Sequence, residues 1–421
     1  MVLLPFDETG LTPHLDELDR LKKSFDASPL VIGWRSRLAS DLMAEAIQAS
    51  TSMEGVPVTV EEVRRILAGD TPANVKPEDA SLVTGYRDAM TYCQRRADDD
   101  VFSWSPELVK GIQDRILAGR ADWGAGRYGK GRFIQNSVTG ELVYTPPQDD
   151  LHGLMLSLCD RMNRWDGHPA LKSAWVHIAL AAIHPFKDGN GRTARVLASL
   201  AMYRGGFKRQ EFISLEEWWG RNRTRYSDAF KCLGPKFDPS ADVTSFIKAH
   251  LQAQVIQVHV LQGIERTQRR VWSGIDAVAS ESGLPERTNV ALWEAFWGRV
   301  VSRPYYLAVA DVKASTGTKD LNLLTAAGML RPEGRTRGKH WVTGERFFPS
   351  LGKQFGLDAD HSSKNEIINV VTSQVVSEAK DISANAAEEG RTMAELPRAE
   401  KNAISHRGWA AAKLRATLRD R

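Results

Sequence analysis

Apolar residues recur every three or four positions along most of the chain, which predicts a mainly α protein. From Arg35 to Met53 they fall roughly on one side of a helix, and Gly55 and Pro57 then end the pattern. Comparable patterns predict helices over residues 60–67, 77–96, 149–163, 170–183, 192–205, 216–233 and 243–279, and one that begins at Pro106.

The glycine-rich segment 124–147 departs from this periodicity. Two short runs, residues 132–134 and 142–144, flank a turn signal at Thr139 and Gly140, and two prolines follow at 146 and 147. This arrangement predicts a small β-hairpin within the helical fold.

The second half of the chain gives weaker signals. Residues 285–346 predict two or three short helices and a strand pair, and the tail after Ser362 predicts helices on a polar or flexible extension. We therefore expect five parts: an N-terminal helical region (1–100), a core (101–250), a helical connector (251–284), a small domain (285–350) and a C-terminal extension (351–421).

Composition limits the class of protein. The 421 residues suffice for two or three domains, and the formal net charge of +4 is too small to indicate a nucleic-acid partner by itself. The three cysteines, Cys93, Cys159 and Cys232, are far apart, which argues against a disulfide framework or a structural zinc site. No signal peptide or membrane-spanning stretch is visible, so we expect a cytoplasmic protein with no membrane association.

The residues with the clearest chemical meaning lie between His184 and Arg195. Gly189 and Gly191 flank an asparagine just before a helix, so backbone N–H groups can face an anion without Cβ atoms in the way. The first turn of that helix adds unpaired N–H groups and the positive end of its dipole. Arg192 and Arg195 are three positions apart on the same helix, so both can reach one polyphosphate.

Two further side chains complete the parts needed for nucleotidyl or phosphoryl transfer. Asp188 places a carboxylate beside the expected anion site, where a magnesium ion bridging phosphate oxygens would bind. His184 is the residue of this segment that can accept a proton near neutral pH. A buried structural histidine in an ordinary loop is the alternative, and the combination of parts argues against it.

This segment resembles the signature of the Fic family, HPFx(D/E)GNGRxxR, and matches it at every specified position. The resemblance implies a helical core with a hairpin flap, Mg²⁺ and ATP, and transfer of AMP to a Ser, Thr or Tyr hydroxyl of a protein, including the chain itself. It implies His184 as the base and Asp188 as the metal ligand. Nucleotide contacts are expected from Lys187, Gly189, Asn190, Gly191, Arg192, Arg195 and Tyr226.

Within the resemblance, Arg192 is expected at the β-phosphate and Arg195 at the γ-phosphate, while Phe186 is a structural anchor under the loop. In the Doc-like kinases of the family, a lysine stands at the position that matches Gly191. Within the resemblance, the glycine of this chain therefore favours AMP transfer over phosphate transfer. The hairpin is similar to the family's flap, which pairs with a target segment like an added strand.

The end of the first long helix resembles the family's inhibitory pattern (S/T)xxxE(G/N), through Ser50, Glu54 and Gly55. The resemblance implies that Glu54 pairs with Arg195 and occupies the guanidinium that should hold the γ-phosphate. We therefore expect an enzyme that restrains itself.

Residues 315–342 resemble a winged helix-turn-helix, with a helix followed by a basic, glycine-rich hairpin. Four basic residues, Arg331, Arg335, Arg337 and Lys339, would face DNA phosphates, or would form a solvated surface in a domain that binds protein. Two alternatives to AMP transfer therefore stay open: a nucleic-acid-binding regulator with a non-catalytic Fic core, and a Fic enzyme that transfers a different phosphate-containing group.

Overall fold

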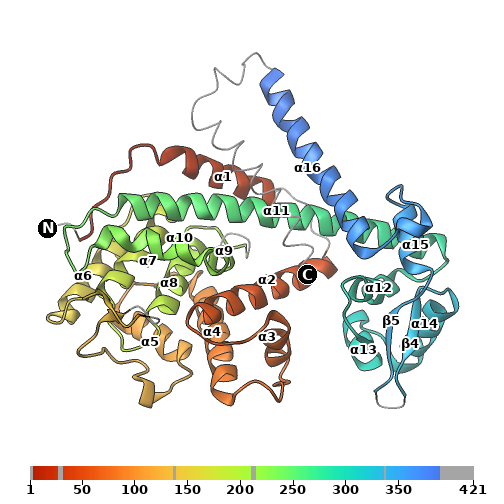
Figure 1. Cartoon of the computed structure of the whole chain (residues 1–421), viewed down its shortest axis with the longest axis horizontal. Coiled ribbons are helices and arrows are strands. Elements are labelled where there is room, and N and C mark those ends of the chain that lie inside the picture. The colour runs from red at the N-terminus through yellow and green to blue at the C-terminus, as the bar shows by residue number, and fades with distance from the viewer. Residues whose placement is uncertain (1–2, 27–31, 136–138, 210–214, 336–337, 389–421) are drawn as a thin grey trace. The chain divides into compact units, whose positions relative to one another are not determined.

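The computed structural model describes residues 3–26, 32–135, 139–209, 215–335 and 338–388 (Figure 1). The described residues are mostly helical, and their strands form two small antiparallel sheets. The predicted mainly α class with a small hairpin is thus confirmed. Within these residues, the helices lack the combination of length and apolarity that crossing a bilayer requires.

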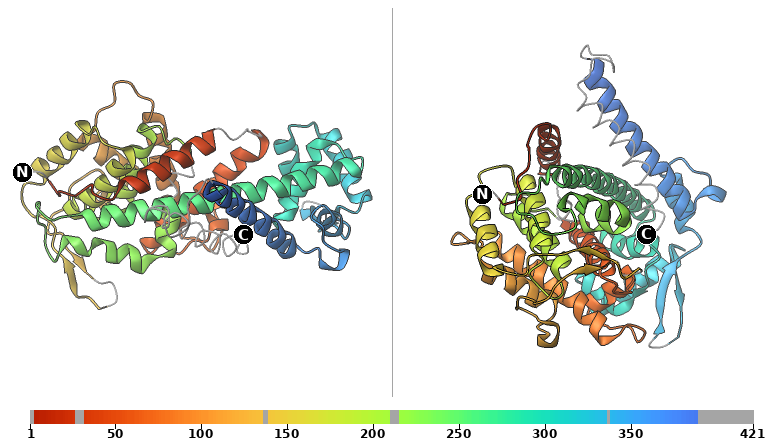
Figure 2. Two further views of the ribbon diagram at one scale, coloured as in Figure 1. Left: turned by 90° about the horizontal axis from the view of Figure 1, so that it is seen from above. Right: turned by 60° about the vertical axis from the view of Figure 1, so that its left-hand side comes forward.

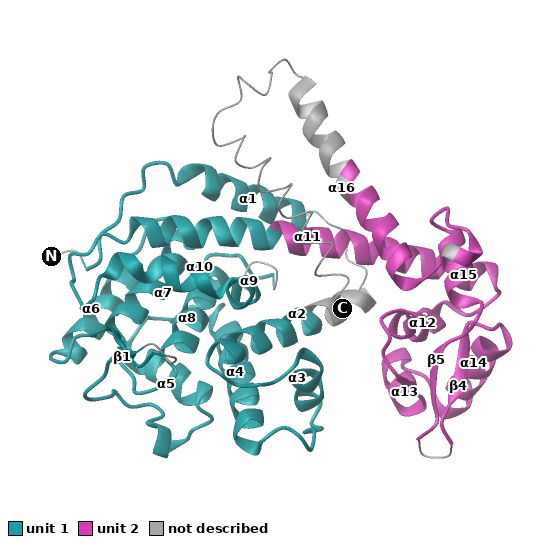
Figure 3. Ribbon diagram, viewed as in Figure 1, with its two compact units in different colours: residues 1–258 teal, residues 259–421 magenta. Residues whose placement is uncertain are grey.

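The chain forms two compact units, residues 1–258 and 259–421 (Figure 3). The boundary falls inside the long helix α11 (Thr244–Glu281). The finer division into five parts stays a prediction.

The first unit is a helical bundle around one hydrophobic core. Its central pair is α7 (Pro169–Ile183) and α8 (Asn190–Arg204), which pack along each other. Because α7 is apolar on nearly all sides, it is buried almost completely. The surrounding helices are α1 (Thr12–Asp26), α2 (Ile32–Met53), α3 (Val60–Leu67), α4 (Pro77–Arg96), α5 (Pro106–Ile116), α6 (Leu151–Asn163), α9 (Leu215–Arg221) and α10 (Arg223–Ala229).

Most helix boundaries agree with the sequence patterns, and the region after α8 is the exception. The single helix expected over residues 216–233 is wrong, because α9 ends at Arg221 and α10 is followed by a 3₁₀ turn, Phe230–Leu233. Asn222 separates the two helices with a non-helical φ of −125° and ψ of 46°, which breaks the backbone hydrogen-bond ladder. Helix α8 also begins two residues earlier than expected, at Asn190.

The predicted hairpin is present as β1 (Ile134–Gln135) and β2 (Leu142–Tyr144). The strands are antiparallel, with Ile134 opposite Tyr144 and a register shift at the next residue. The hairpin projects from the bundle (Figure 2), and Phe133, Leu142 and Val143 are exposed on it. Tyr144 points inward instead, and its hydroxyl donates to the carbonyl of Ala182 in α7 at 2.9 Å.

The second unit joins short helices to a three-stranded antiparallel sheet. The sequence predicted only a strand pair, and the third strand is β3, which pairs with β5 in the order β3-β5-β4. A two-residue strand is too short to give a periodic signal. The elements are α12 (Asn289–Phe296), β3 (Val301–Ser302), α13 (Arg303–Ala310), α14 (Ala314–Ala326), β4 (Leu330–Glu333), β5 (His340–Thr343), α15 (Phe347–Lys353) and α16 (Lys364–Glu388).

The winged-helix assignment of this unit stays a prediction. Arg331, Arg335 and Lys339 are exposed on or beside the β4–β5 hairpin, and Arg337 lies outside the described residues. Residues 389–421 also lie outside them.

Candidate active site

A sharp turn between α7 and α8 forms the core of the site. His184 caps α7 in the left-handed conformation (φ 47°, ψ 55°), and Gly189 takes φ 80° just before α8. Asn190 staples the turn: its side-chain Nδ2 donates to the carbonyl of Phe186 (2.8 Å), and its Oδ1 accepts from the Phe186 N–H (2.9 Å). Phe186 itself is fully buried, as expected of an anchor. The side-chain amide of Asn190 is thus engaged inside the loop, so the backbone N–H of Asn190 is the group that remains to face a phosphate.

Two residues that the sequence did not single out hold the turn from below. Gln113 of α5 donates to the carbonyl of Asp188 (3.0 Å) and accepts from the N–H of Gly126 (2.6 Å). Arg132 donates to the carbonyls of Ile183, His184 and Pro147, which ties the hairpin to the end of α7. Both come from distant parts of the chain and belong to no recognisable motif.

His184 is held in its neutral form. Burial lowers the pKa of His184 to about 4, and the nearby charge of Arg132 adds to this shift against the opposing effects of the Ala181 backbone, Glu54 and Asp188. At neutral pH its imidazole is therefore free to accept a proton.

Asp188 and Arg192 form one half of the site. Their ion pair measures 3.0 Å, and the Asp188 side chain is 47% exposed, whereas that of Arg192 is only 2% exposed. The Nε and Nη1 atoms of Arg192 have no hydrogen-bond partner among the described residues. Because a buried guanidinium needs its N–H groups satisfied, this arrangement fits an anionic ligand at the start of α8.

Asp188 places a single carboxylate beside the start of α8. Within the described residues, three or more His, Cys, Asp or Glu side chains do not come together in a way that could hold a metal ion. Asp188 still suits magnesium, because that ion is commonly held by one or two carboxylates together with phosphate oxygens and water.

Glu54 fills the other half of the site. A Cβ atom placed on Gly191 would lie 2.6 Å from Oε1 of Glu54 and 3.2 Å from Nη1 of Arg195. The carboxylate therefore lies directly against the glycine where the sequence predicts phosphate oxygens. Gly55 follows with φ 87°, a conformation that favours glycine, and turns the chain away after α2.

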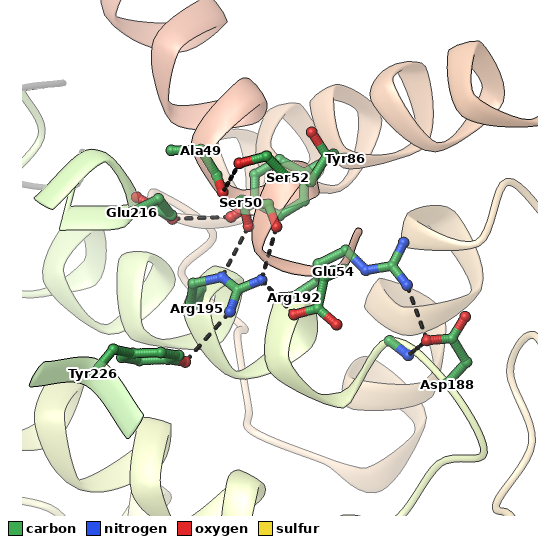
Figure 4. Close-up of polar contacts among 12 residues, drawn as sticks. Ala49, Ser50, Ser52, Glu54, Tyr86, Asp188, Arg192, Arg195, Glu216 and Tyr226 are labelled. Carbon is green, nitrogen blue, oxygen red and sulfur yellow. Dashed lines mark hydrogen bonds and ion pairs between the residues drawn. The ribbon is translucent and has the colours of Figure 1, made fainter. Parts of the chain in front are cut away.

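Arg195 is fully engaged by this carboxylate and its neighbours (Figure 4). Its Nη2 donates to Oε1 of Glu54 (2.9 Å) and to the carbonyl of Ser50 (3.1 Å), and its Nε donates to Oγ of Ser50 (2.8 Å). Partial burial opposes the charge of Glu54, but Arg195 and Arg192 outweigh it and hold the pKa of Glu54 below its ordinary value. Glu54 is thus ionised at neutral pH.

The nucleotide contacts expected from Tyr226 and Lys187 stay predictions. The hydroxyl of Tyr226 accepts from Nη1 of Arg195 (3.3 Å) and lies 3.0 Å from Nε2 of His177, so Tyr226 faces the arginine network. Lys187 is exposed on the turn. The structure therefore brings His184, Asp188, Gly191, Arg192 and Arg195 together with Glu54, while Lys187 points to solvent.

A sequence model of the Fic/DOC family matches residues 103–202, a range that contains α5, the hairpin, α7 and most of α8. The chain contains a Fic domain. A second model, of the Ham1 family, matches residues 384–417, most of which lie outside the described residues.

The Fic domain is shared with curated relatives. The chain is 28% identical over 197 residues to a protein adenylyltransferase Fic of Nematostella vectensis, which covers 46% of this chain and 45% of that protein. It is 30% identical over 208 residues to the protein of the same name from Culex quinquefasciatus, covering 47% of this chain and 40% of that one. The chain thus spans less than half the length of these relatives.

Solved structures share the fold. A Fic family protein from Desulfovibrio desulfuricans superposes with a TM-score of 0.53 at 18% identity, covering 81% of this chain and 98% of the other. A fragment of Fic-1 from C. elegans gives a TM-score of 0.50 at 20% identity, covering 61% and 73%. At these identities the similarity establishes the helical Fic fold alone.

Proposed function

We propose that the Fic domain transfers the AMP part of ATP to a Ser, Thr or Tyr hydroxyl of a protein. The observation that carries this proposal is the Arg192 guanidinium, buried at the N-terminus of α8 with two nitrogen atoms unpartnered among the described residues. Its ion-pair partner Asp188 lies close enough to His184 to affect its pKa, and His184 is neutral at pH 7. An anion site next to a proton acceptor is what nucleotidyl transfer requires.

In the proposed reaction the hydroxyl oxygen of the target attacks the α-phosphorus of ATP, and the bond to the departing pyrophosphate breaks. The proton of the hydroxyl passes to the imidazole of His184. The backbone N–H groups of Gly189, Asn190 and Gly191 bind the α- and β-phosphates, Arg192 binds the β-phosphate and Arg195 the γ-phosphate. Asp188 would hold a magnesium ion, which would neutralise charge on the leaving phosphates.

The absence of a side chain at Gly191 supports AMP transfer over phosphate transfer. The space above Gly191 is taken by the carboxylate of Glu54 and by Nη1 of Arg195, and no lysine enters it from position 191 itself. A triphosphate tail can therefore use this space once the carboxylate leaves.

Glu54 is the proposed brake. Its carboxylate occupies a hydrogen-bonding edge of Arg195 and adds negative charge beside Gly191, where the γ-phosphate would bind. Since like charges repel, ATP bound in this state would have its phosphates displaced from the position for attack.

The hairpin is the proposed docking edge for the target protein. Phe133, Leu142 and Val143 expose apolar side chains on it, and its strands begin and end beside the α7–α8 turn through Arg132 and Tyr144. An extended target segment added to this edge would bring its hydroxyl toward His184. A cytoplasmic target and location remain our expectation from composition.

The test uses Glu54→Gly protein with magnesium and ATP carrying a radioactive label on either the α- or the γ-phosphate. AMP transfer predicts incorporation of the α label alone, and it predicts none in the Glu54→Gly/His184→Ala protein. Incorporation of the γ label would show phosphate transfer, and loss of both labels would contradict the proposal. ATP-induced stabilisation against heat, measured with magnesium, separates this function from a Fic enzyme that uses another phosphate-containing donor.

A second candidate function is nucleic-acid binding by the second unit. Residues 285–350 contain ten Lys or Arg and six Asp or Glu, so this segment alone carries the formal net charge of +4 found for the whole chain. A groove in it is lined by Arg303 and Lys339 together with Thr318 and Asn322 on α14 and Trp341 on β5. Cations and hydrogen-bonding side chains beside an exposed helix suit a DNA groove and its phosphates.

Duplex DNA binding of the full chain, titrated at several salt concentrations, tests this second function. Arg303→Ala/Lys339→Ala should weaken binding and flatten its salt dependence, since each lost phosphate contact lowers the logarithmic slope by about 1. Lys130→Ala/Lys231→Ala removes two charges from the first unit and is the matched control. Equal effects of both pairs would contradict a DNA site on the second unit. Two results together would favour a non-catalytic regulator: DNA binding that is kept in His184→Ala protein, and no detectable AMP transfer by the native chain.

A further inference from the structure

The hydrogen bonds of Arg195 continue into the protein interior through two separate chains. Arginine can only donate, so each oxygen that accepts from it must direct its own proton elsewhere. Following those protons leads to two buried acceptors that the proposed reaction does not use.

The first chain runs through Tyr226. Its hydroxyl oxygen accepts from Nη1 of Arg195 at 3.3 Å, so the hydroxyl proton is left for Nε2 of His177, 3.0 Å away. His177 is 1% exposed, and its pKa lies well below the ordinary value because burial and the charges of His250 and Arg195 disfavour protonation. A neutral imidazole with its proton on Nδ1 accepts at Nε2, and this tautomer gives the Tyr226 hydroxyl proton an acceptor.

The second chain runs through Ser50. Its Oγ accepts from Nε of Arg195 at 2.8 Å, and its hydroxyl is hydrogen-bonded to Tyr86. The Tyr86 hydroxyl in turn donates to Oε1 of Glu216 at 2.9 Å. Figure 4 shows Ser50, Tyr86 and Glu216 gathered on the side of Arg195 away from Asp188. Tyr86 and Glu216 are both buried, so bulk water does not compete for these bonds.

Both chains end at the same place. His177, Glu216 and Arg195 line one small pocket, which has room for a water molecule but not for a nucleotide. It lies between α7, α8, α9 and α11, and its α8 residues continue the helix face that carries Gly191, on the C-terminal side of Arg195. The two acceptors therefore reach Arg195 through intervening hydroxyl groups, His177 through Tyr226 and Glu216 through Tyr86 and Ser50.

Ordinary core packing does not account for this pattern. Phe in place of Tyr86 and Tyr226, and Leu in place of Glu216, would fill the same space without the cost of burying polar groups. The hydrogen-bonded residues instead come from α2, α4, α7, α9 and α10, and together they fix the plane of the Arg195 guanidinium. Its remaining N–H edge then faces Gly191, where Nη1 would approach an added Cβ to 3.2 Å.

We infer that His177 and Glu216 are positioning residues for Arg195, which hold its guanidinium in the orientation that receives the γ-phosphate of ATP. This inference rests on the proposed function. Arg195 keeps this orientation after Glu54 is removed, because neither chain passes through Glu54. The predicted signature is selective: contacts to the γ-phosphate depend on the two chains, and contacts to the α- and β-phosphates do not.

Calorimetric titration of Glu54→Gly protein with magnesium and either ATP or ADP tests the inference. Added Tyr86→Phe or Tyr226→Phe, each of which removes one hydroxyl, should weaken ATP binding roughly fivefold and change ADP binding less than about twofold. Glu216→Leu should behave like Tyr86→Phe. Glu216→Gln keeps a carbonyl oxygen as acceptor and should restore ATP binding to within about twofold.

Tyr92→Phe is the matched control, since it removes a tyrosine hydroxyl from the same helix as Tyr86 but outside both chains. Thermal unfolding of each variant monitors folding, and the two phenylalanine variants keep the aromatic packing. Equal losses for ATP and ADP, or no loss in Tyr86→Phe protein, would overturn the inference while leaving the proposed function intact. Failure of the Glu54→Gly reference itself to bind ATP would overturn both.

Discussion

The two halves of the Fic site differ in how their arginines are satisfied, although Arg192 and Arg195 lie one turn apart on α8. Arg195 donates to Ser50, Glu54 and Tyr226, and each of its nitrogen atoms has a partner. Arg192 is equally buried, yet it is paired with Asp188 through a single nitrogen. One half is closed by the protein's own carboxylate, and the other retains unsatisfied cationic groups.

This difference indicates which part of the triphosphate is excluded in the resting state. The Arg192 half keeps guanidinium nitrogens without a partner among the described residues, whereas the Arg195 half must first release Glu54. Restraint by Glu54 therefore acts on the end of the nucleotide tail and leaves the start of α8 available.

The largest effect is expected from His184, which belongs to neither half and acts on the proton. In a Glu54→Gly background, His184→Ala should reduce AMP transfer at least about 100-fold, because general-base catalysis typically contributes that much or more. ATP binding should be unchanged by calorimetry, since His184 is not expected to hold phosphate. Substantial residual transfer would assign the base elsewhere.

The two arginines should separate by ligand and by stability. Arg192→Leu should weaken ATP and ADP binding alike, by roughly 10-fold or more, and leave folding stability nearly unchanged because an unsatisfied buried group is removed. Arg195→Leu should weaken ATP binding only, and should cost roughly 3 kcal/mol of stability in the native chain because Glu54 loses its partner. Denaturant unfolding and calorimetry of both variants measure these effects, and a reversed pattern would contradict the contrast.

Self-labelling by ATP should increase when the Glu54 carboxylate is removed from Arg195. Glu54→Gly should raise self-labelling by ATP about 10-fold or more, since it deletes a charge-assisted bond and the repulsion of the phosphates. Ser50→Ala leaves the Glu54 carboxylate on Arg195 and removes an acceptor that orients the guanidinium, so it should not raise labelling. Unchanged or lower labelling in Glu54→Gly protein would eliminate the brake. Glu61→Gly, in α3 and outside the site, controls for the substitution itself.

The smallest expected effect concerns pH. The pKa of His184 is lowered to about 4, so its imidazole stays deprotonated until the pH falls well below the 6.5 of an ordinary histidine. The acid limb of kcat/KM, which reports the free enzyme, should therefore lie near pH 4–5. In Glu54→Gly protein it should move lower still, because Glu54 raises this pKa. An acid limb near pH 6.5 would show that His184 is not buried as described.

Much of the fold and site could be predicted from local patterns. The helices over residues 60–67 and 77–96 agree with their amphipathic runs, and the turn from His184 to Gly191 was visible from its glycines and the following helix. Glu54 was recognisable only by its similarity to the inhibitory pattern, and its contact with Arg195 bridges 141 positions.

The supporting residues could not be predicted in this way. Gln113 and Arg132 lie 75 and 51 positions from the atoms they bind, and Tyr86 lies 130 positions from Glu216. Such contacts arise from tertiary packing, and single polar residues on otherwise apolar faces carry no periodic signal. Tyr226 shows the limit clearly, since the sequence suggested a nucleotide contact but gave no sign of the hydrogen bond to Arg195.

Intact-mass spectrometry of Glu54→Gly protein after incubation with magnesium and ATP is the most direct test of AMP transfer by this Fic domain. AMP transfer predicts a mass increase of one AMP, located by fragmentation on a Ser, Thr or Tyr side chain and absent from Glu54→Gly/His184→Ala protein. A mass increase of one phosphate would contradict AMP transfer. So would the absence of any mass increase, on this protein or in an added target extract, when the protein binds ATP.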